Sequence, residues 1–216
     1  LLAAAGIALG FRLVPGPALV RAERTWTITT SADAGPGSLR ESLEQQAPGD
    51  TIRFDPAVFP FDAPGVIALL SDLPEIRSSG LVLDAGGAGV VLSGTRLRGT
   101  NSSNTGIIVR DAADVAIRGL IFDDFGGGAI ALKGGAARTT IGAHPDSPEV
   151  EAQDGNVFCG GTVGVRIGRA GAVGNVVAGN RFGSLRNGAN RPCGGQAASS
   201  VFVFAGAQGT RIGGPG

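Results

Sequence analysis

The acidic residues best placed to form a metal or acid–base site are Asp123 and Asp124, which directly follow the apolar run 120–122. Carboxylate oxygens are the ligands that Ca²⁺ takes in proteins. Adjacent residues of an extended segment point to opposite sides, so this pair cannot enclose an ion by itself. Residues 159 and 183, which follow the corresponding apolar runs, are not acidic. We therefore retain Asp123 and Asp124 as metal candidates and favour a solvated turn.

Other catalytic arrangements find little support in the sequence. His144 is the sole histidine, and we interpret it as an exposed loop residue, so neither a triad nor a His-rich metal site is predicted. The chain has neither a Gly-x-Ser-x-Gly nucleophile motif nor a Gly-rich loop that ends in Gly-Lys-Ser/Thr. Two carboxylates for glycoside hydrolysis can come from any two segments, but no hydrolase pattern is present. No residue is assigned a catalytic role.

The chain contains two cysteines, Cys159 and Cys193. Cys159 directly follows the apolar run 156–158, and Cys193 lies within the insertion 183–200. A disulfide between them would tether this long insertion to the neighbouring strand, and it would suit an oxidising compartment. Two separate buried thiols are the alternative that the sequence leaves open.

An internal repeat indicates which elements carry these residues. The segment "IALKGGAARTTIGA" (130–143) aligns without gaps with "VFVFAGAQGTRIGG" (201–214). Apolar residues occupy the same positions in both, as Ile130 and Val201 show. A recurring unit of this kind is typical of solenoid architectures.

Short runs with alternating apolar residues recur between and around these two segments. Alternation of this kind is the pattern of a half-buried strand. Three runs per unit, separated by Gly-rich corners, predict an all-β parallel β-helix with three strands per coil. A hairpin sandwich is the competing architecture, but it calls for more Asn-Gly turns than Asn187-Gly188. The runs are 107–109, 115–117, 120–122, 130–132, 139–141, 156–158, 165–167, 175–177, 180–182, 201–203 and 210–212.

The corners explain much of the composition, because the chain has 38 Gly residues without a collagen period. Glycine and asparagine adopt positive φ more readily than other residues, and they suit sharp turns. Asn156, Asn175 and Asn180 each follow a corner glycine or lie beside one. We expect these asparagines to bond backbone groups of a neighbouring coil rather than a ligand.

A short helix is predicted before the repeats, in "GPGSLRESLEQQAPGD" (35–50). Ser38 and Glu41 form a Ser-x-x-Glu capping box, and Leu39 and Leu43 lie on one helical face. Strands are expected at 25–30, 51–54, 65–70, 81–85 and 90–93. The helix is suited to cap the first coil and protect its edge.

Two stretches carry a resemblance to a known group. "GSLRESLEQQAPGDTIRF" is similar to the Ser-Leu-Arg-Glu-Ala-Leu … Pro-Gly-Asp-Thr-Ile-x-Phe pattern that opens many exported bacterial right-handed β-helix proteins. The later Ile-Gly and Gly-Asn-Val segments resemble the repeats of the same group, which has the pectate-lyase-like superfamily fold. The resemblance implies a right-handed, single-stranded parallel β-helix and a secreted or surface-exposed solenoid, and it implies no single chemistry.

The terminal segments and the charge balance of the chain indicate in which compartment, and with which kinds of partner, the protein is expected to act. Residues 1–22 resemble the remnant of a signal peptide, and residues 23–216 form the β-helix, which we expect to be truncated at its C-terminal end. Arg12, Pro15 and Pro17 interrupt the apolar run, so no membrane span is expected in the mature chain. Lys+Arg and Asp+Glu both number 18, which argues against nucleic-acid binding.

These observations favour a secreted or cell-surface module that is structural, adhesive or in contact with polysaccharide, without catalysis. Its expected partners are extracellular polysaccharide or host and cell-surface components, and the expected state is monomeric. No cofactor is expected. The alternative is a polysaccharide lyase or glycoside hydrolase of the pectate-lyase-like superfamily, with its active site partly outside this sequence and with Ca²⁺ as a possible lyase cofactor.

Overall fold

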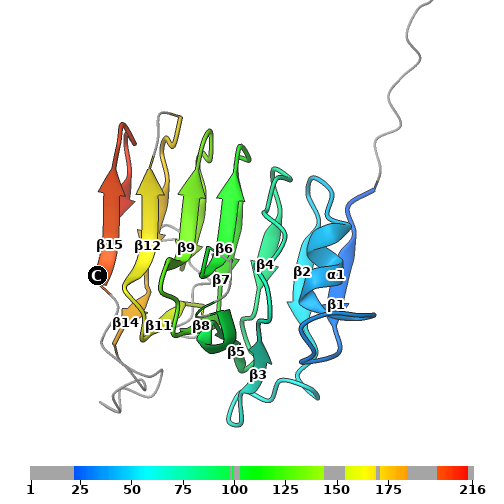
Figure 1. Ribbon diagram of the computed structural model, residues 1–216. Helices are drawn as coiled ribbons and strands as arrows, with labels where there is room; N and C mark the ends of the chain where they lie inside the picture. The colour runs from blue at the N-terminus through cyan, green and yellow to red at the C-terminus, as the bar shows by residue number, and fades with distance from the viewer. Residues whose placement is uncertain are drawn as a thin grey trace, which may run out of the picture.

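The structure is a computed structural model that describes residues 22–97, 99, 103–143, 154–168, 171–183 and 199–213. The described residues form three parallel β-sheets, which we call sheets A, B and C (Figure 1). Sheet A contains, in spatial order, β1 (Thr25–Ile28), β2 (Thr51–Phe54), β4 (Val82–Asp84), β7 (Ala116–Arg118), β10 (Thr140–Gly142), β13 (Val176–Ala178) and β16 (Arg211–Ile212).

The other two sheets are shorter. Sheet B contains β3 (Gly65–Ala68), β5 (Val90–Ser93), β8 (Leu120–Asp123), β11 (Val157–Cys159) and β14 (Arg181–Phe182). Sheet C contains β6 (Thr105–Arg110), β9 (Gly128–Lys133), β12 (Val163–Gly168) and β15 (Ser199–Phe204). The remaining elements are the helix α1 (Leu39–Glu44) and the 3₁₀ turn η1 (Thr95–Leu97).

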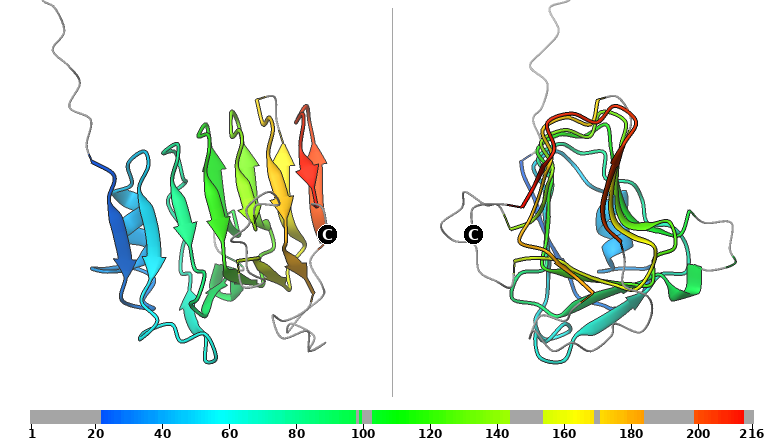
Figure 2. Two further views of the ribbon diagram at one scale, coloured as in Figure 1. Left: turned by 180° about the vertical axis from the view of Figure 1, so that it is seen from behind. Right: turned by 90° about the vertical axis from the view of Figure 1, so that its left-hand side faces the viewer.

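Successive strands of the repeat region enter sheets C, A and B in turn. Each strand pairs with its equivalent in the unit before it, and every pairing among the described strands is parallel. Viewed along the stack, the chain traces a closed, roughly triangular outline (Figure 2). The predicted all-β class with parallel sheets is therefore confirmed, and it is compatible with a parallel β-helix. A sandwich of antiparallel hairpins does not fit these pairings.

The internal repeat reflects columns of equivalent side chains. Ile130 pairs with Val165, which pairs with Val201, as the alignment of 130–143 with 201–214 requires. In sheet B the rings of Phe122, Phe158 and Phe182 stack with centroid separations of 5.2 and 4.8 Å. These columns form one continuous apolar core, so burial of the alternating residues explains the period of two.

The asparagines lie at corners between strands, as the sequence predicts. The side chains of Asn156 and Asn175 are fully buried. Oδ1 of Asn175 accepts from the backbone N–H of Thr139 (2.9 Å), and its Nδ2 donates to the carbonyl of Ala136 (3.1 Å). Asn156 bonds backbone groups of a neighbouring strand in the same manner. The expectation that these residues tie adjacent segments together is confirmed.

Helix α1 lies at the N-terminal end of the stack (Figure 1). Ser38 is its N-cap residue, and the Ser38 Oγ accepts from the backbone N–H of Glu41 (3.2 Å). The Glu41 carboxylate accepts from the N–H of Gly37 (2.7 Å) rather than from the N–H of Ser38, one residue away from a standard capping box. Leu39 and Leu43 are buried in the core.

A buried carboxylate that sequence reasoning missed secures this end. Asp50 is fully buried and accepts hydrogen bonds from the backbone N–H groups of Arg24 and Ala47 and from the indole N–H of Trp26. Three N–H donors around one carboxylate compensate its removal from water. This network joins β1 to the segment that leads into β2.

No helix in the described part of the chain is both long and apolar enough to cross a membrane. Residues 1–21 of the expected signal segment lie outside the described residues. His144 and Cys193 lie outside them as well.

Candidate ligand-binding groove

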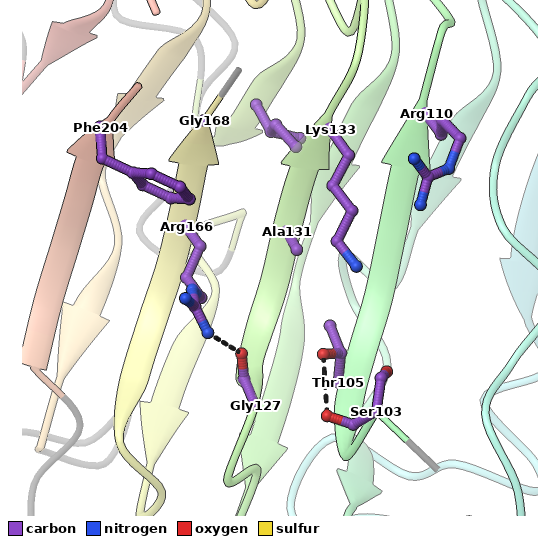
Figure 3. Close-up of a pocket in the computed structure, with 10 residues that line it drawn as sticks. Ser103, Thr105, Arg110, Gly127, Ala131, Lys133, Arg166, Gly168 and Phe204 are labelled. Atoms are coloured by element: carbon purple, nitrogen blue, oxygen red, sulfur yellow. Dashed lines mark hydrogen bonds between the residues drawn. The ribbon is translucent and has the colours of Figure 1, made fainter. Parts of the chain in front are cut away.

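A groove of about 390 Å³ lies on the outward face of sheet C (Figure 3). Its lining includes the cationic side chains Arg110, Lys133 and Arg166, the hydroxyl-bearing residues Ser103 and Thr105, and the aromatic ring of Phe204. We call this feature the sheet C groove. Its residues come from four neighbouring strands and from the loop before β6.

Strand alternation places these side chains on one face. Ile130 and Leu132 of β9 point into the core, so Ala131 and Lys133 face outward. Arg110 pairs in register with Lys133, and Ala131 pairs with Arg166. Because parallel strands lie about 4.8 Å apart, the sheet brings these three cations together from residues far apart in sequence.

Arg110 is held by a carboxylate. Its Nε and Nη2 donate to the two oxygens of Glu75 at 2.8 and 2.9 Å. The hydrogen bonds from Arg110 lower the pKa of Glu75, against the opposing effect of burial. The same contact raises the pKa of Arg110. The charge of Arg110 is therefore largely compensated within the protein.

Lys133 lacks such compensation. Its ammonium group has no hydrogen-bond or ion-pair partner among the described residues. Burial lowers the pKa of Lys133, and the charges of Arg110 and Arg166 lower it further, while Glu75 and Asp72 act in the opposite direction. Burial is the largest cause of the lowered pKa, and the absence of a direct partner among the described residues leaves the Lys133 ammonium open to a ligand.

Arg166 also has no carboxylate partner among the residues that the structure describes. Its Nη1 donates to the carbonyl of Gly127 (3.0 Å), and its guanidinium carbon lies 5.8 Å from the centroid of the Phe204 ring. The aliphatic stem passes over Gly128, where a Cβ would lie 2.9 Å from the Arg166 Cδ. Gly128 therefore leaves space for the arginine to cross β9 toward the groove.

The ring of Phe204 lines one end of the groove (Figure 3). Phe202 and Phe204 stack on each other with centroids 5.1 Å apart, and they are 50% and 37% exposed. The Phe204 ring lies over Gly168, at a position that a Cβ would fill. Exposed ring faces beside cations can bind the C–H faces of a ligand, because the π face carries partial negative charge.

A second hollow lies on the outward face of sheet A, beside Arg53 and Asp84. Asp84 accepts from Nη2 of Arg118 (2.8 Å) and from the backbone N–H of Gly86 (2.9 Å), and Arg53 lies 3.6 Å away. The cations on this face share a carboxylate between them. This arrangement stabilises the sheet and leaves less charge for a ligand than the sheet C groove does.

The predicted metal candidates, Asp123 and Asp124, lie at the end of β8. Oδ2 of Asp123 lies 3.3 Å from the donating hydroxyl of Ser93. Asp124 follows with a φ of 58°, in the turn after the strand. The described residues contain no cluster of three or more His, Cys, Asp or Glu side chains that could share a metal ion. The metal assignment of this pair stays a prediction.

Cys159 ends β11, where it pairs in register with Asp123. The residue is disulfide-bonded. Cys193, the other cysteine of the chain, lies outside the described residues, so the Cys159–Cys193 connection stays the pairing predicted from the sequence.

The groove residues were missed at the level of sequence, although two signals pointed to them. Arg110 and Lys133 each directly follow an apolar run at the same position of the repeat, after Val109 and Leu132. Lys133 is also the only lysine of the chain. Neither signal pointed to Arg166, because this residue lies within its apolar run, between Val165 and Ile167.

The chain matches no protein-family model, and a comparison with curated proteins found no match.

Proposed function

We propose that this chain is a secreted or cell-surface right-handed β-helix with three strands per coil, of the pectate-lyase-like type, that contacts acidic polysaccharide through the sheet C groove. The regular order of strands through three parallel sheets supports the architecture. The Ser-Leu-Arg-Glu segment at the N-terminal end supports the likeness to exported solenoids.

The single observation that carries the proposal is the pair of cations, Lys133 and Arg166, that lack a carboxylate partner among the described residues. Both line an open groove with hydroxyl groups and an aromatic ring. A carboxylate or sulfate of a polysaccharide would supply the missing negative charge. The exposed Ser103 and the Phe204 ring offer contacts for uncharged parts of a sugar.

The arrangement favours contact over catalysis. The carboxylate nearest to the cations, Glu75, is engaged by both oxygens with Arg110 and stays ionised because its pKa is lowered. It is therefore a poor proton donor for a leaving group. We propose a binding module of structural or adhesive use, and the lyase or hydrolase is the outcome that would contradict it.

Binding to polygalacturonate and alginate, with dextran as the neutral control, tests this proposal, with and without Ca²⁺. We expect binding to the two acidic polymers only, weakened by salt. The double variant Lys133→Gln/Arg166→Gln should lose about tenfold or more in affinity, as expected when charge-assisted contacts are removed. Arg138→Gln is the matched control, because Arg138 is an exposed arginine paired with Asp114 away from the groove.

Two results would overturn the proposal. Equal binding of the double variant and the wild type would remove the groove from the interaction. Release of unsaturated products or new reducing ends from any of the polymers would show turnover and favour the enzyme.

A further inference from the structure

The sheet C groove holds the one side-chain amine of the protein. Lys133 is the only lysine in the chain, and every other strongly basic side chain is an arginine. A guanidinium group stays protonated in proteins and does not act as a nucleophile, whereas an amine that loses its proton can. Within this sequence, nucleophilic amine chemistry on a side chain can therefore occur only at Lys133, in the groove.

The position of Lys133 suits it to this chemistry. Its side chain extends along the groove between those of Arg110 and Arg166 (Figure 3). The charged groups that act on it are Arg110 of β6, Arg166 of β12, Glu75 and Asp72. No described residue accepts a hydrogen bond from its amine, so nothing in the described chain must be displaced before the amine reacts.

Nearby cations and burial also make the free amine more available. Both lower the pKa of Lys133, so at any given pH more of it is unprotonated than of an ordinary lysine. Desolvation or an adjacent cation is the usual means by which proteins activate a lysine toward carbonyl compounds.

We propose that Lys133 captures small anionic aldehydes and ketones as reversible imines. The inference rests on the proposed function in one respect, because the same cationic groove holds the anion. Arg166 binds the carboxylate or phosphate of the ligand, since its charge has no carboxylate partner in the described chain. Arg110, engaged with Glu75, adds a weaker attraction.

The reaction is balanced without a further reactant. The unprotonated Nζ of Lys133 attacks the carbonyl carbon. A C–N bond forms, the π bond of the C=O group breaks, and a proton lost by the nitrogen passes to the oxygen to give a carbinolamine. Loss of one water molecule then gives the C=N bond, and addition of water reverses the step. Neither partner is oxidised or reduced. The volume of the groove, about 390 Å³, lies within the range of small-molecule sites.

Pyridoxal phosphate and 5-deoxypyridoxal form a matched pair of probes, because neither can close to a cyclic hemiacetal and only the first carries the phosphate. The whole protein is titrated with each aldehyde, the imine is followed by its absorbance, and it is then trapped with borohydride and located by peptide mass. Since the chain has one lysine, the terminal α-amino group is the internal reference.

We expect saturable modification of Lys133 that is about tenfold tighter for pyridoxal phosphate than for 5-deoxypyridoxal, whereas the α-amino group shows no such preference. Arg166→Gln should reduce this preference at Lys133 to about twofold or less, and Arg138→Gln should leave it unchanged. Lys133→Arg should abolish the imine at this position. Polysaccharide binding by the wild type needs no imine, so it is measured independently of the trapped product. Capture and polysaccharide contact can therefore fail separately.

The wild-type titration alone can contradict the inference. Equal modification of Lys133 by the two aldehydes would remove the anion selectivity. Modification of the α-amino group with Lys133 left unreacted would remove the capture site. An unchanged phosphate preference in Arg166→Gln would overturn the role of that arginine.

Discussion

Two aspartates on neighbouring sheets, Asp84 and Asp123, differ in the sign of their contribution to stability. Burial raises the pKa of Asp84, but hydrogen bonds from Arg118 and Gly86 and the charges of Arg118 and Arg53 outweigh it, so the pKa is lowered. For Asp123 burial again raises the pKa, the charge of Asp124 adds to it, and the Ser93 hydrogen bond offsets only part. The neighbours decide which form the fold prefers.

Substitution of each aspartate by asparagine should change the free energy of unfolding at neutral pH in opposite directions. Ionised Asp84 contributes stability that is present above its unfolded-state pKa of about 3.9 and is lost as the pH falls through the lower folded-state value. Asp84→Asn should therefore lower the free energy of unfolding at neutral pH by about 2 kcal/mol, as expected for hydrogen bonds to a charged group, and reduce its loss in acid.

For Asp123, ionisation lowers the free energy of unfolding instead of raising it. Its folded-state pKa is raised, so its contribution is favourable at low pH and declines as the pH rises from about 3.9 through the folded-state value. Asp123→Asn should raise the free energy of unfolding at neutral pH. Urea unfolding at acidic and neutral pH measures both variants, and a loss of neutral-pH stability in Asp123→Asn would contradict the assignment.

At the scale of elements, the buried asparagines connect neighbouring strands where the backbone turns. Asn175→Ala removes the side-chain oxygen that accepts from the Thr139 N–H and the side-chain nitrogen that donates to the Ala136 carbonyl. Leaving these buried groups without partners should cost about 3 kcal/mol in free energy of unfolding. Gln208→Ala is the matched control, because this amide side chain is exposed in the turn before β16, and its removal should cost less than about 0.5 kcal/mol.

The columns of inward-facing apolar side chains predict which positions of a strand tolerate a charged residue. Ile141 is fully buried between Ile117 and Val177 of the adjacent strands. Ile141→Asp places an unpaired charge in this column, so we expect a loss of more than about 4 kcal/mol or failure to fold. The neighbouring Thr140→Asp, on the outward face of the same strand, should change stability by less than about 1 kcal/mol. Thermal unfolding that is the same for both variants would show that Ile141 is not an inward residue.

Strand positions could be predicted because burial of one face requires apolar residues at alternating positions. The same apolar positions also recur in each repeat unit, so two patterns identify each strand. All the predicted runs in the repeat region overlap strands. The groove could not be predicted in the same way, since its cations lie on outward positions where burial leaves no period. Asp50 was missed for another reason: its partners include the indole of Trp26, which is distant in sequence.

For the whole molecule, the disulfide at Cys159 is the covalent constraint to test. If it joins Cys193, the closed loop runs from 159 to 193 and includes the first part of the predicted insertion 183–200. Reduction should then lower the free energy of unfolding by about 2–4 kcal/mol. Peptide mapping without reductant should recover one cross-linked peptide that contains both residues. The double variant Cys159→Ser/Cys193→Ser should match the reduced wild type. An unfolding temperature that does not respond to reductant would contradict a stabilising role.

Residue-by-residue pairing between equivalent strands has a consequence for how such a molecule can change in size. Insertion of one complete unit, a strand for each sheet, offers the same pairing edges to the units on either side, so length can grow by duplication without redesign of existing contacts. Addition of a single residue inside a strand instead exchanges its two faces and exposes apolar side chains to water. Evolutionary lengthening in whole units is therefore tolerated, whereas small insertions are confined to the corners.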